Sequence, residues 1–272
     1  MLIKLIKYDF IRESRNLLFW SLGIVSITLL LCLFYPTIKD QGALMDEYMA
    51  AFPEEMIAFL GDLGGGLSSA SGYLSLELFG IMAPAIFVVY GCRLAVGSIA
   101  GEEYSRTIEL MLSLPIKREV FVFARFIGIA MNLLLLTLGF VVTLIISAAL
   151  FDMDISPFIL FQNGLNVWML ALSLSALTFF VGSAWGTRGV AYAVGFGAFF
   201  VGYLISSLAG FVEWLGQVKY LSFFYYYNGY YTAADLNSLI DGILLTPWLV
   251  MGSSIVFFLV LAILMLPRRD IH

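Results

Sequence analysis

"FVFARFIGIAMNLLLLTLGFVVTLIISAAL", residues 121–150, is an almost unbroken apolar run in which Arg125 is the only charged side chain. A helix needs about 20 mostly apolar residues to cross the ~30 Å hydrocarbon layer of a membrane. Other runs of this kind lie near residues 17–36, 78–99, 164–185, 190–212 and 248–266. The sequence therefore predicts six transmembrane helices.

The composition supports the same fold class. Hydrophobic residues make up 61% of the chain and charged residues 12%, with a mean hydropathy of +0.97. Soluble domains are about half apolar and about a quarter charged. We therefore expect an all-α, multi-pass protein of the cell membrane, with residues 1–272 forming a single transmembrane domain.

The distribution of basic residues predicts the orientation. If the N-terminus is cytoplasmic, only Lys39 and Lys219 of the 14 basic residues fall on the outer side. Lys and Arg are concentrated in cytoplasmic loops of membrane proteins. Both termini are therefore expected in the cytoplasm.

Three segments outside the apolar runs have a character of their own. Residues 1–15 mix basic and apolar side chains, which favours an interfacial helix, although a basic flank that only fixes topology fits equally well. Residues 37–77 form an acidic outer loop. Residues 213–247 contain the aromatic cluster "YLSFFYYYNGYY", which predicts re-entrant or interfacial helices on the outer side, with a ligand path lined by aromatics as the alternative.

Several kinds of chemistry are not expected in this chain. The only histidine is His272, and no Gly-Lys pair is present from which a phosphate-binding P-loop could be built. Cys32 and Cys92 both lie in apolar runs, which favours packing over a disulfide or metal pair. We expect no catalytic residue, metal site, bound cofactor or nucleic-acid partner, and no buried carboxylate for proton coupling.

The most charged stretch, Glu102 to Arg125, precedes and enters the run quoted above and holds eight charged residues. A helix over 102–114 would place Glu102, Arg106 and Glu109 on one face and Tyr104, Ile108 and neighbouring apolar residues on another. Pro115 would end that helix. The pattern predicts an amphipathic helix on the cytoplasmic side, with one face available to a soluble protein or to the inner leaflet.

The segment "EEYSRTIELMLSLPIKR" resembles the hallmark of ABC-2-type permeases, the membrane subunits of ATP-binding-cassette transporters. The pattern has a Glu-rich start, a Thr-x-Glu and a Pro-x-x-Arg. Its matching positions here are Glu102, Glu103, Thr107, Glu109, Pro115 and Arg118. Arg106 stands where a glycine is often found in the family. The ending "LPRRDI", residues 266 to 271, is also similar to that of many such permeases.

The resemblance implies a function. The segment 100–118 would be a cytoplasmic coupling helix between the second and third spans, docking on a separate ABC ATPase subunit that holds ATP and magnesium. Arg106 would belong to it with the six matching residues. By this resemblance, two identical permease copies would form a homodimer and line a pathway for export in contact with membrane lipid.

Two other functional classes remain open on the residues alone. One is a self-contained secondary transporter or channel, and the other is a membrane scaffold or integral membrane enzyme without transport. Substrate-binding residues are unknown. Asn132, Asn163 and Asn166 are polar residues in the spans, but hydrogen bonds between helices explain them as well as a pathway does.

Overall fold

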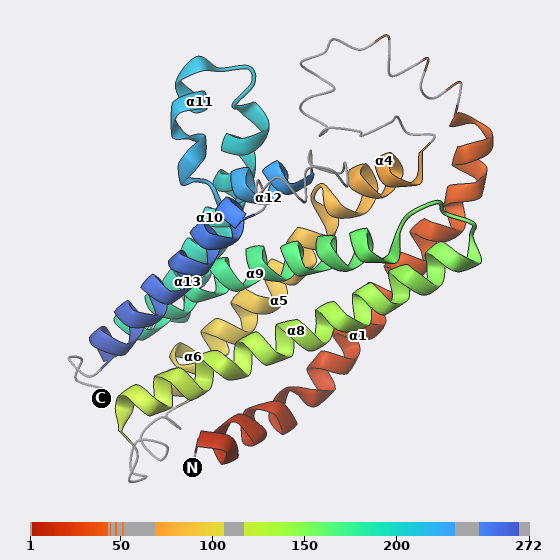
Figure 1. Cartoon of the computed structure of the whole chain (residues 1–272). Helices are drawn as coiled ribbons and strands as arrows, with labels where there is room; N and C mark the ends of the chain where they lie inside the picture. The colour runs from red at the N-terminus through yellow and green to blue at the C-terminus, as the bar shows by residue number, and fades with distance from the viewer. Residues whose placement is uncertain are drawn as a thin grey trace.

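The computed structural model describes residues 2–42, 44, 47, 51, 69–105, 117–231 and 245–266. These residues form a bundle of long helices with short helices at its ends (Figure 1). In chain order the elements are α1 (Leu2–Asp40), α4 (Ala70–Leu74), the π-helix η1 (Ser75–Phe79), α5 (Met82–Ser98), α6 (Ala100–Tyr104), α8 (Arg118–Leu150), α9 (Pro157–Trp185), α10 (Arg188–Leu208), α11 (Glu213–Val218), the 3-10 helix η2 (Lys219–Leu221), α12 (Phe223–Tyr231) and α13 (Leu245–Met265).

The six predicted spans are confirmed within the described residues. Six helical segments are long and apolar enough to cross a membrane, and no strand occurs in the described part of the chain. The first residues of α1, the helix α6 and the last residues of α13 lie at one end of the bundle, here called the α6 end (Figure 1). The helices α11 and α12 lie at the other, the α12 end.

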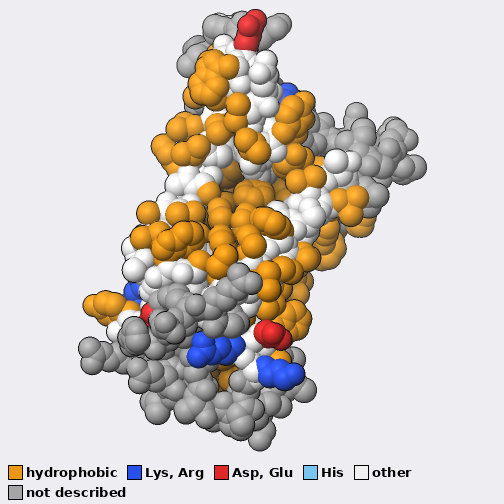
Figure 2. All heavy atoms as spheres, turned by 90° about the vertical axis from the view of Figure 1, so that its left-hand side faces the viewer, with side chains coloured by type: hydrophobic (Ala, Val, Ile, Leu, Met, Phe, Trp, Pro, Cys, Tyr) orange, Lys and Arg blue, Asp and Glu red, His pale blue; other side chains and the backbone are white. Residues whose placement is uncertain are grey.

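The exposed side chains differ between the middle of the bundle and its two ends. On the face shown in Figure 2, apolar side chains cover the middle of the bundle, and charged side chains lie toward its two ends. Exposed large apolar residues occur along α1, α8, α10 and α13. This is the distribution expected when the middle of the bundle is surrounded by hydrocarbon.

The helix α9 is at the centre of the bundle. In its most apolar window 78% of the residues are buried, against 17% in α1, α10 and α13. Its hydroxyl groups are satisfied within the helix, because Ser173, Ser175, Thr178 and Ser183 each donate to the carbonyl four residues earlier. Such bonds let a polar residue lie in an apolar interior without an external partner.

Helix α9 also begins and ends on clear local signals. Pro157 occupies the first turn, where its missing N–H costs nothing. At the other end Gly186 adopts a left-handed conformation with φ of 68°, and its N–H donates to the Gly182 carbonyl. Glycine takes this conformation without the steric penalty of a side chain. The connection to α10 is therefore as short as the spacing of the apolar runs 164–185 and 190–212 implies, since α10 begins at Arg188.

Several boundaries differ from the predicted ones. Helix α1 runs without a break from Leu2 to Asp40, so the predicted interfacial segment 1–15 is continuous with the first span. The predicted outer loop 37–77 is shorter at both ends, because α1 extends to Asp40 and the second helical segment begins at Ala70. Flanking residues of mixed polarity continue the helices past the runs that hydropathy alone identifies.

The second span is interrupted rather than kinked at its proline. It consists of α4, η1 and α5, and the helix is broken at Gly80 and Ile81, where Ile81 has non-helical backbone angles (φ −141°, ψ −33°). Pro84 lies in the first turn of α5, where a proline removes no helical hydrogen bond. The proline therefore lies at a helix start and not within a continuous helix.

Short helices occupy residues 213–231, as predicted for the outer segment 213–247. Helix α12 returns into the bundle, and its Tyr227 is fully buried. The Tyr227 hydroxyl donates to the Phe79 carbonyl at 2.8 Å, at the interruption of the second span. Ser222 donates to the Gly202 carbonyl at 2.7 Å. The residues 232–244 lie outside the described part.

Close helix packing generates a testable prediction at Gly195 on α10. A Cβ atom there would overlap Thr178 Oγ1 and lie 3.0 Å from Cys92 Sγ and 3.4 Å from Thr178 Cβ. Gly195→Ala should lower the free energy of unfolding by about 1–3 kcal/mol through overpacking. The measurement is thermal unfolding of the purified chain in one mild detergent.

Gly197→Ala is the matched control, because a Cβ atom at Gly197 meets nothing within 4 Å. This variant should be neutral or slightly more stable, since alanine is the better helix former by about 1 kcal/mol. Equal stability of the two variants would contradict the packing at Gly195.

Candidate functional site

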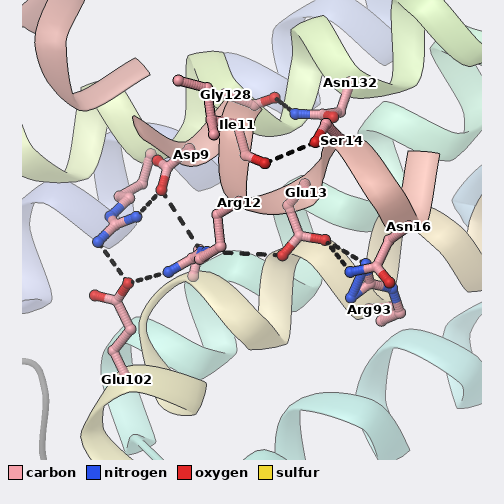
Figure 3. A network of polar contacts seen from close by, with 12 residues as sticks. Asp9, Ile11, Arg12, Glu13, Ser14, Asn16, Arg93, Glu102, Gly128 and Asn132 are labelled. Atoms are coloured by element: carbon pink, nitrogen blue, oxygen red, sulfur yellow. Dashed lines mark hydrogen bonds and ion pairs between the residues drawn. The ribbon is translucent and has the colours of Figure 1, made fainter. Parts of the chain in front are cut away.

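The predicted coupling segment begins at the α6 end, where four helices meet. Helix α6 follows α5 after Ile99, whose backbone angles (φ −121°, ψ −64°) interrupt the helix. The starts of α1, α8 and α10 each contribute an arginine that contacts α6 or its neighbours. The close-up in Figure 3 shows the charged side chains of α1 pointing toward α5 and α6.

Arg125 is the central group of this region. Its side chain has no exposed surface, although it lies only two turns into α8, about 10 Å from the start of the helix. Nη1 forms an ion pair with Asp9 on α1, and Nη2 donates to Glu102 Oε1 at 2.5 Å. The guanidinium also lies 4.9 Å from the centre of the Phe121 ring. The charge is thus enclosed by partners from two other helices.

Glu102 on α6 connects two of the arginines. Its Oε1 accepts hydrogen bonds from Arg125 and also from Arg12 Nη1, the latter at 2.6 Å. Arg12 Nη2 lies 3.5 Å from Asp9 Oδ1 as well. One carboxylate oxygen of α6 is therefore held by a guanidinium from α1 and one from α8.

The network extends along α1 to α5. Glu13 forms an ion pair with Arg93 of α5 and accepts a hydrogen bond from Asn16 at 2.9 Å. Its other oxygen, Oε1, lies 3.7 Å from Arg12 Nε. We call the six charged residues of this network the arginine–carboxylate cluster: Asp9, Arg12, Glu13, Arg93, Glu102 and Arg125.

The spacing in the sequence explains how one helix supplies half of the cluster. Three residues follow Asp9 at spacings of three, four and seven positions, namely Arg12, Glu13 and Asn16. All four therefore lie on one face of α1. The cluster contains three arginines and three carboxylates. If all six are ionised, their charges cancel, which is the condition under which buried ions are tolerated.

A second contact holds α6 through its backbone. Arg188, the first residue of α10, donates to the Gly101 carbonyl at 2.8 Å, and its guanidinium lies 4.3 Å from the centre of the Tyr104 ring. A Cβ atom at Gly101 would stand 3.4 Å from Arg188 Nη2. The absence of a side chain there leaves room for the arginine. Helix α6 is thus connected to α1, α8 and α10 by arginines.

The predicted coupling residues fall into three groups. Glu102 is 4% exposed and directed inward, which differs from the expectation that its face is available to a partner. Glu103 is half-buried, and Arg118 is exposed as the first residue of α8. Arg106, Thr107, Glu109 and Pro115 lie outside the described residues. Helix α6 extends to Tyr104, and the rest of the predicted helix 102–114 is also outside them.

Two of the three candidate asparagines in the spans form hydrogen bonds within the bundle. Asn166 accepts a hydrogen bond from Trp248 Nε1 at 2.9 Å, which connects α9 to α13. Asn132 donates to the Gly128 carbonyl within α8 at 2.8 Å. Asn163 is half-buried on α9. A hydrogen bond between helices is therefore confirmed for Asn166.

Sequence reasoning missed the importance of Asp9 and Arg125. Two signals were present: Asp9 is a carboxylate within a basic N-terminal segment, and Arg125 is the only charge in the run 121–150. Each charge is unusual in its own segment, and the two charges have opposite sign. The structure brings them together.

Removing Arg125 tests the energetic role of the cluster. Arg125→Met should lower the free energy of unfolding by about 3–5 kcal/mol, because Asp9 and Glu102 lose their shared buried partner. Arg118→Met, an exposed change on the same helix, should stay within about 0.5 kcal/mol of the wild type. Thermal unfolding in detergent measures both, and similar effects of the two variants would contradict the burial of Arg125.

Comparison with known proteins places this arrangement in a family. No curated protein matches the chain. Residues 3–271 match the sequence model of a family described as "ABC-2 family transporter protein". That match covers almost the whole chain, including α6, the arginine–carboxylate cluster and all six candidate spans. The chain therefore belongs to the ABC-2 transporter family and is a multi-pass membrane protein.

Proposed function

We propose that this permease subunit of an ABC transporter works as an exporter, driven by a separate ABC ATPase subunit that docks on the segment 100–118. The observation that carries the proposal is the attachment of α6 to three other helices through Arg12, Arg125 and Arg188. A force applied to this segment reaches α1, α8 and α10 directly. Such connections are what a subunit without its own ATP site requires.

The charge distribution supports a cytoplasmic position for this segment. The α6 end carries the exposed residues Lys7, Arg15, Lys117 and Arg118, and basic residues are concentrated on the cytoplasmic side of membrane proteins. Both ends of the described chain lie there as well (Figure 1). A soluble ATPase with bound ATP and magnesium would therefore meet the 100–118 segment in the cytoplasm.

A dimer is part of the proposal. Helices α10 and α13 are only 17% buried over their most apolar windows in the single chain. Both hold exposed aromatic residues, such as Phe200 on α10 and Phe257 on α13. A second copy of the permease, together with membrane lipid, would cover these surfaces. Two copies would match two ATPase subunits.

Self-driven transport is less well supported by the described residues. A secondary transporter places ionisable groups near the middle of the bilayer, where they carry the coupled ion. In the described spans, the carboxylates lie toward the helix ends, and those of the arginine–carboxylate cluster are paired with arginines. Export is favoured over import by the resemblance to ABC-2 permeases.

Co-purification from the native host tests the ATPase partner. The wild-type chain, extracted in a mild detergent, should bring an ABC ATPase subunit that mass spectrometry identifies. A Glu109→Ala, Arg118→Ala double variant should recover several-fold less of it, because both positions belong to the predicted docking segment. Glu213→Ala, on α11 at the opposite end, is the control and should recover the wild-type amount.

Recovery of the wild-type chain without any ATPase, in several mild detergents, would overturn the proposal. The alternative would then be a self-contained secondary transporter or channel.

A further inference from the structure

We propose that Glu102 is a positioning residue that transmits the displacement of the docking segment to α1 and α8, and is not itself a contact for the ATPase. This inference rests on the proposed function and assigns a role within it. It separates Glu102 from the residues that follow it in the same segment.

The Glu102 side chain points into the protein. It is 4% exposed, and its Oε1 accepts from Arg125 at 2.5 Å and from Arg12 at 2.6 Å. A carboxylate enclosed in this way has little surface to offer a soluble partner. Both of these hydrogen bonds are made within the permease. The conformation seen here thus assigns Glu102 to the interior of the chain.

Helix α6 is held at two points by the neighbouring helices. It is a separate short helix, because Ile99 interrupts the continuation of α5. Its backbone is held by Arg188 through the Gly101 carbonyl, and its side chain Glu102 is held by the arginine–carboxylate cluster. Charge-assisted hydrogen bonds with two donors on one acceptor oxygen resist displacement in more than one direction. A shift of α6 must therefore move its partners or break these bonds.

The two arginines that hold Glu102 belong to different long helices, Arg12 to α1 and Arg125 to α8. Helices α1 and α8 lie side by side over much of their length (Figure 1). They are joined near their cytoplasmic ends by the ion pair between Asp9 and Arg125. A force on Glu102 is thus applied to both helices at once, and they respond as a pair. The ion pair between Glu13 and Arg93 extends the connection to α5.

The test compares binding of the ATPase with the motion that ATP produces. Spin labels are placed at Ile11 on α1 and Leu264 on α13, both exposed near the α6 end, after Cys32→Ala and Cys92→Ala remove the native thiols. Labelled chain is diluted with unlabelled chain in the complex with its ATPase, so that measured distances arise within one chain. Distances are recorded without nucleotide and with ATP and vanadate.

Glu102→Gln is the main variant. It keeps the shape of the side chain and removes its charge, while Arg125 retains Asp9 as a partner. We expect the ATPase subunit to be recovered in the wild-type amount and the nucleotide-dependent change in the α1–α13 distance to fall by half or more. Glu119→Gln, the same chemical change at an exposed position in the first turn of α8, should leave both measurements unchanged.

Arg12→Gln is a second variant, which keeps the inference testable if Glu102→Gln does not fold. Arg12 is 33% exposed, so its replacement is milder, and it removes one of the two connections to Glu102. We expect a reduced distance change with normal recovery of the ATPase. A purely structural role would lower the yield or the melting temperature without this separation of binding from motion.

The possible failures are distinguishable. A wild-type distance change in both Glu102→Gln and Arg12→Gln would overturn the inference, and so would a wild-type complex in which nucleotide does not change the α1–α13 distance. Loss of the ATPase subunit in Glu102→Gln, with normal recovery in Glu119→Gln, would also overturn it, because Glu102 would then be a docking contact. A wild-type chain that brings no ATPase overturns the proposed function, and the inference with it.

Discussion

A guanidinium shielded from water is the constraint on which the α6 end depends. Transfer of an isolated charge from water into a protein interior costs several kcal/mol or more, so it is found with compensating partners. Arg125 meets this requirement with carboxylates from α1 and α6, and those carboxylates in turn hold Arg12. The positions of three helices are therefore mutually dependent. Packing of apolar side chains alone would leave the helices freer to slide along one another.

The rest of the bundle follows a different principle. Its central helix, α9, satisfies its hydroxyl groups internally and meets its neighbours mainly through apolar side chains, with hydrogen bonds such as that between Trp248 and Asn166 in addition. Contacts there depend on shape, as at Gly195, where a single methyl group has no room. The charged, specific contacts are thus concentrated at the α6 end, and the non-directional ones fill the middle.

The sequence predicts the spans well because their signal is local. Twenty apolar residues in a row identify a membrane helix whatever its neighbours are, and the residues after Gly186 identify a tight turn in the same way. The cluster is not local: Asp9 and Arg125 are 116 residues apart. Nothing in the segment around Glu102 shows that the side chain points inward, since its partners are set by tertiary packing. Helix ends were also missed, as at Ala70, because flanking residues of mixed polarity continue a helix once its neighbours cover it.

The order of the cluster along the chain has a consequence for biosynthesis. Membrane proteins are made from the N-terminus, and early segments can associate before later ones exist. Asp9, Arg12, Glu13, Arg93 and Glu102 all precede Arg125 in the chain. When Arg125 leaves the ribosome, every partner that it contacts in the cluster has already been made. The charge can be neutralised as α8 is inserted, without waiting for α9, α10 or α13, so the most costly group in the bundle never has to stay unpaired for the time needed to synthesise the second half of the protein.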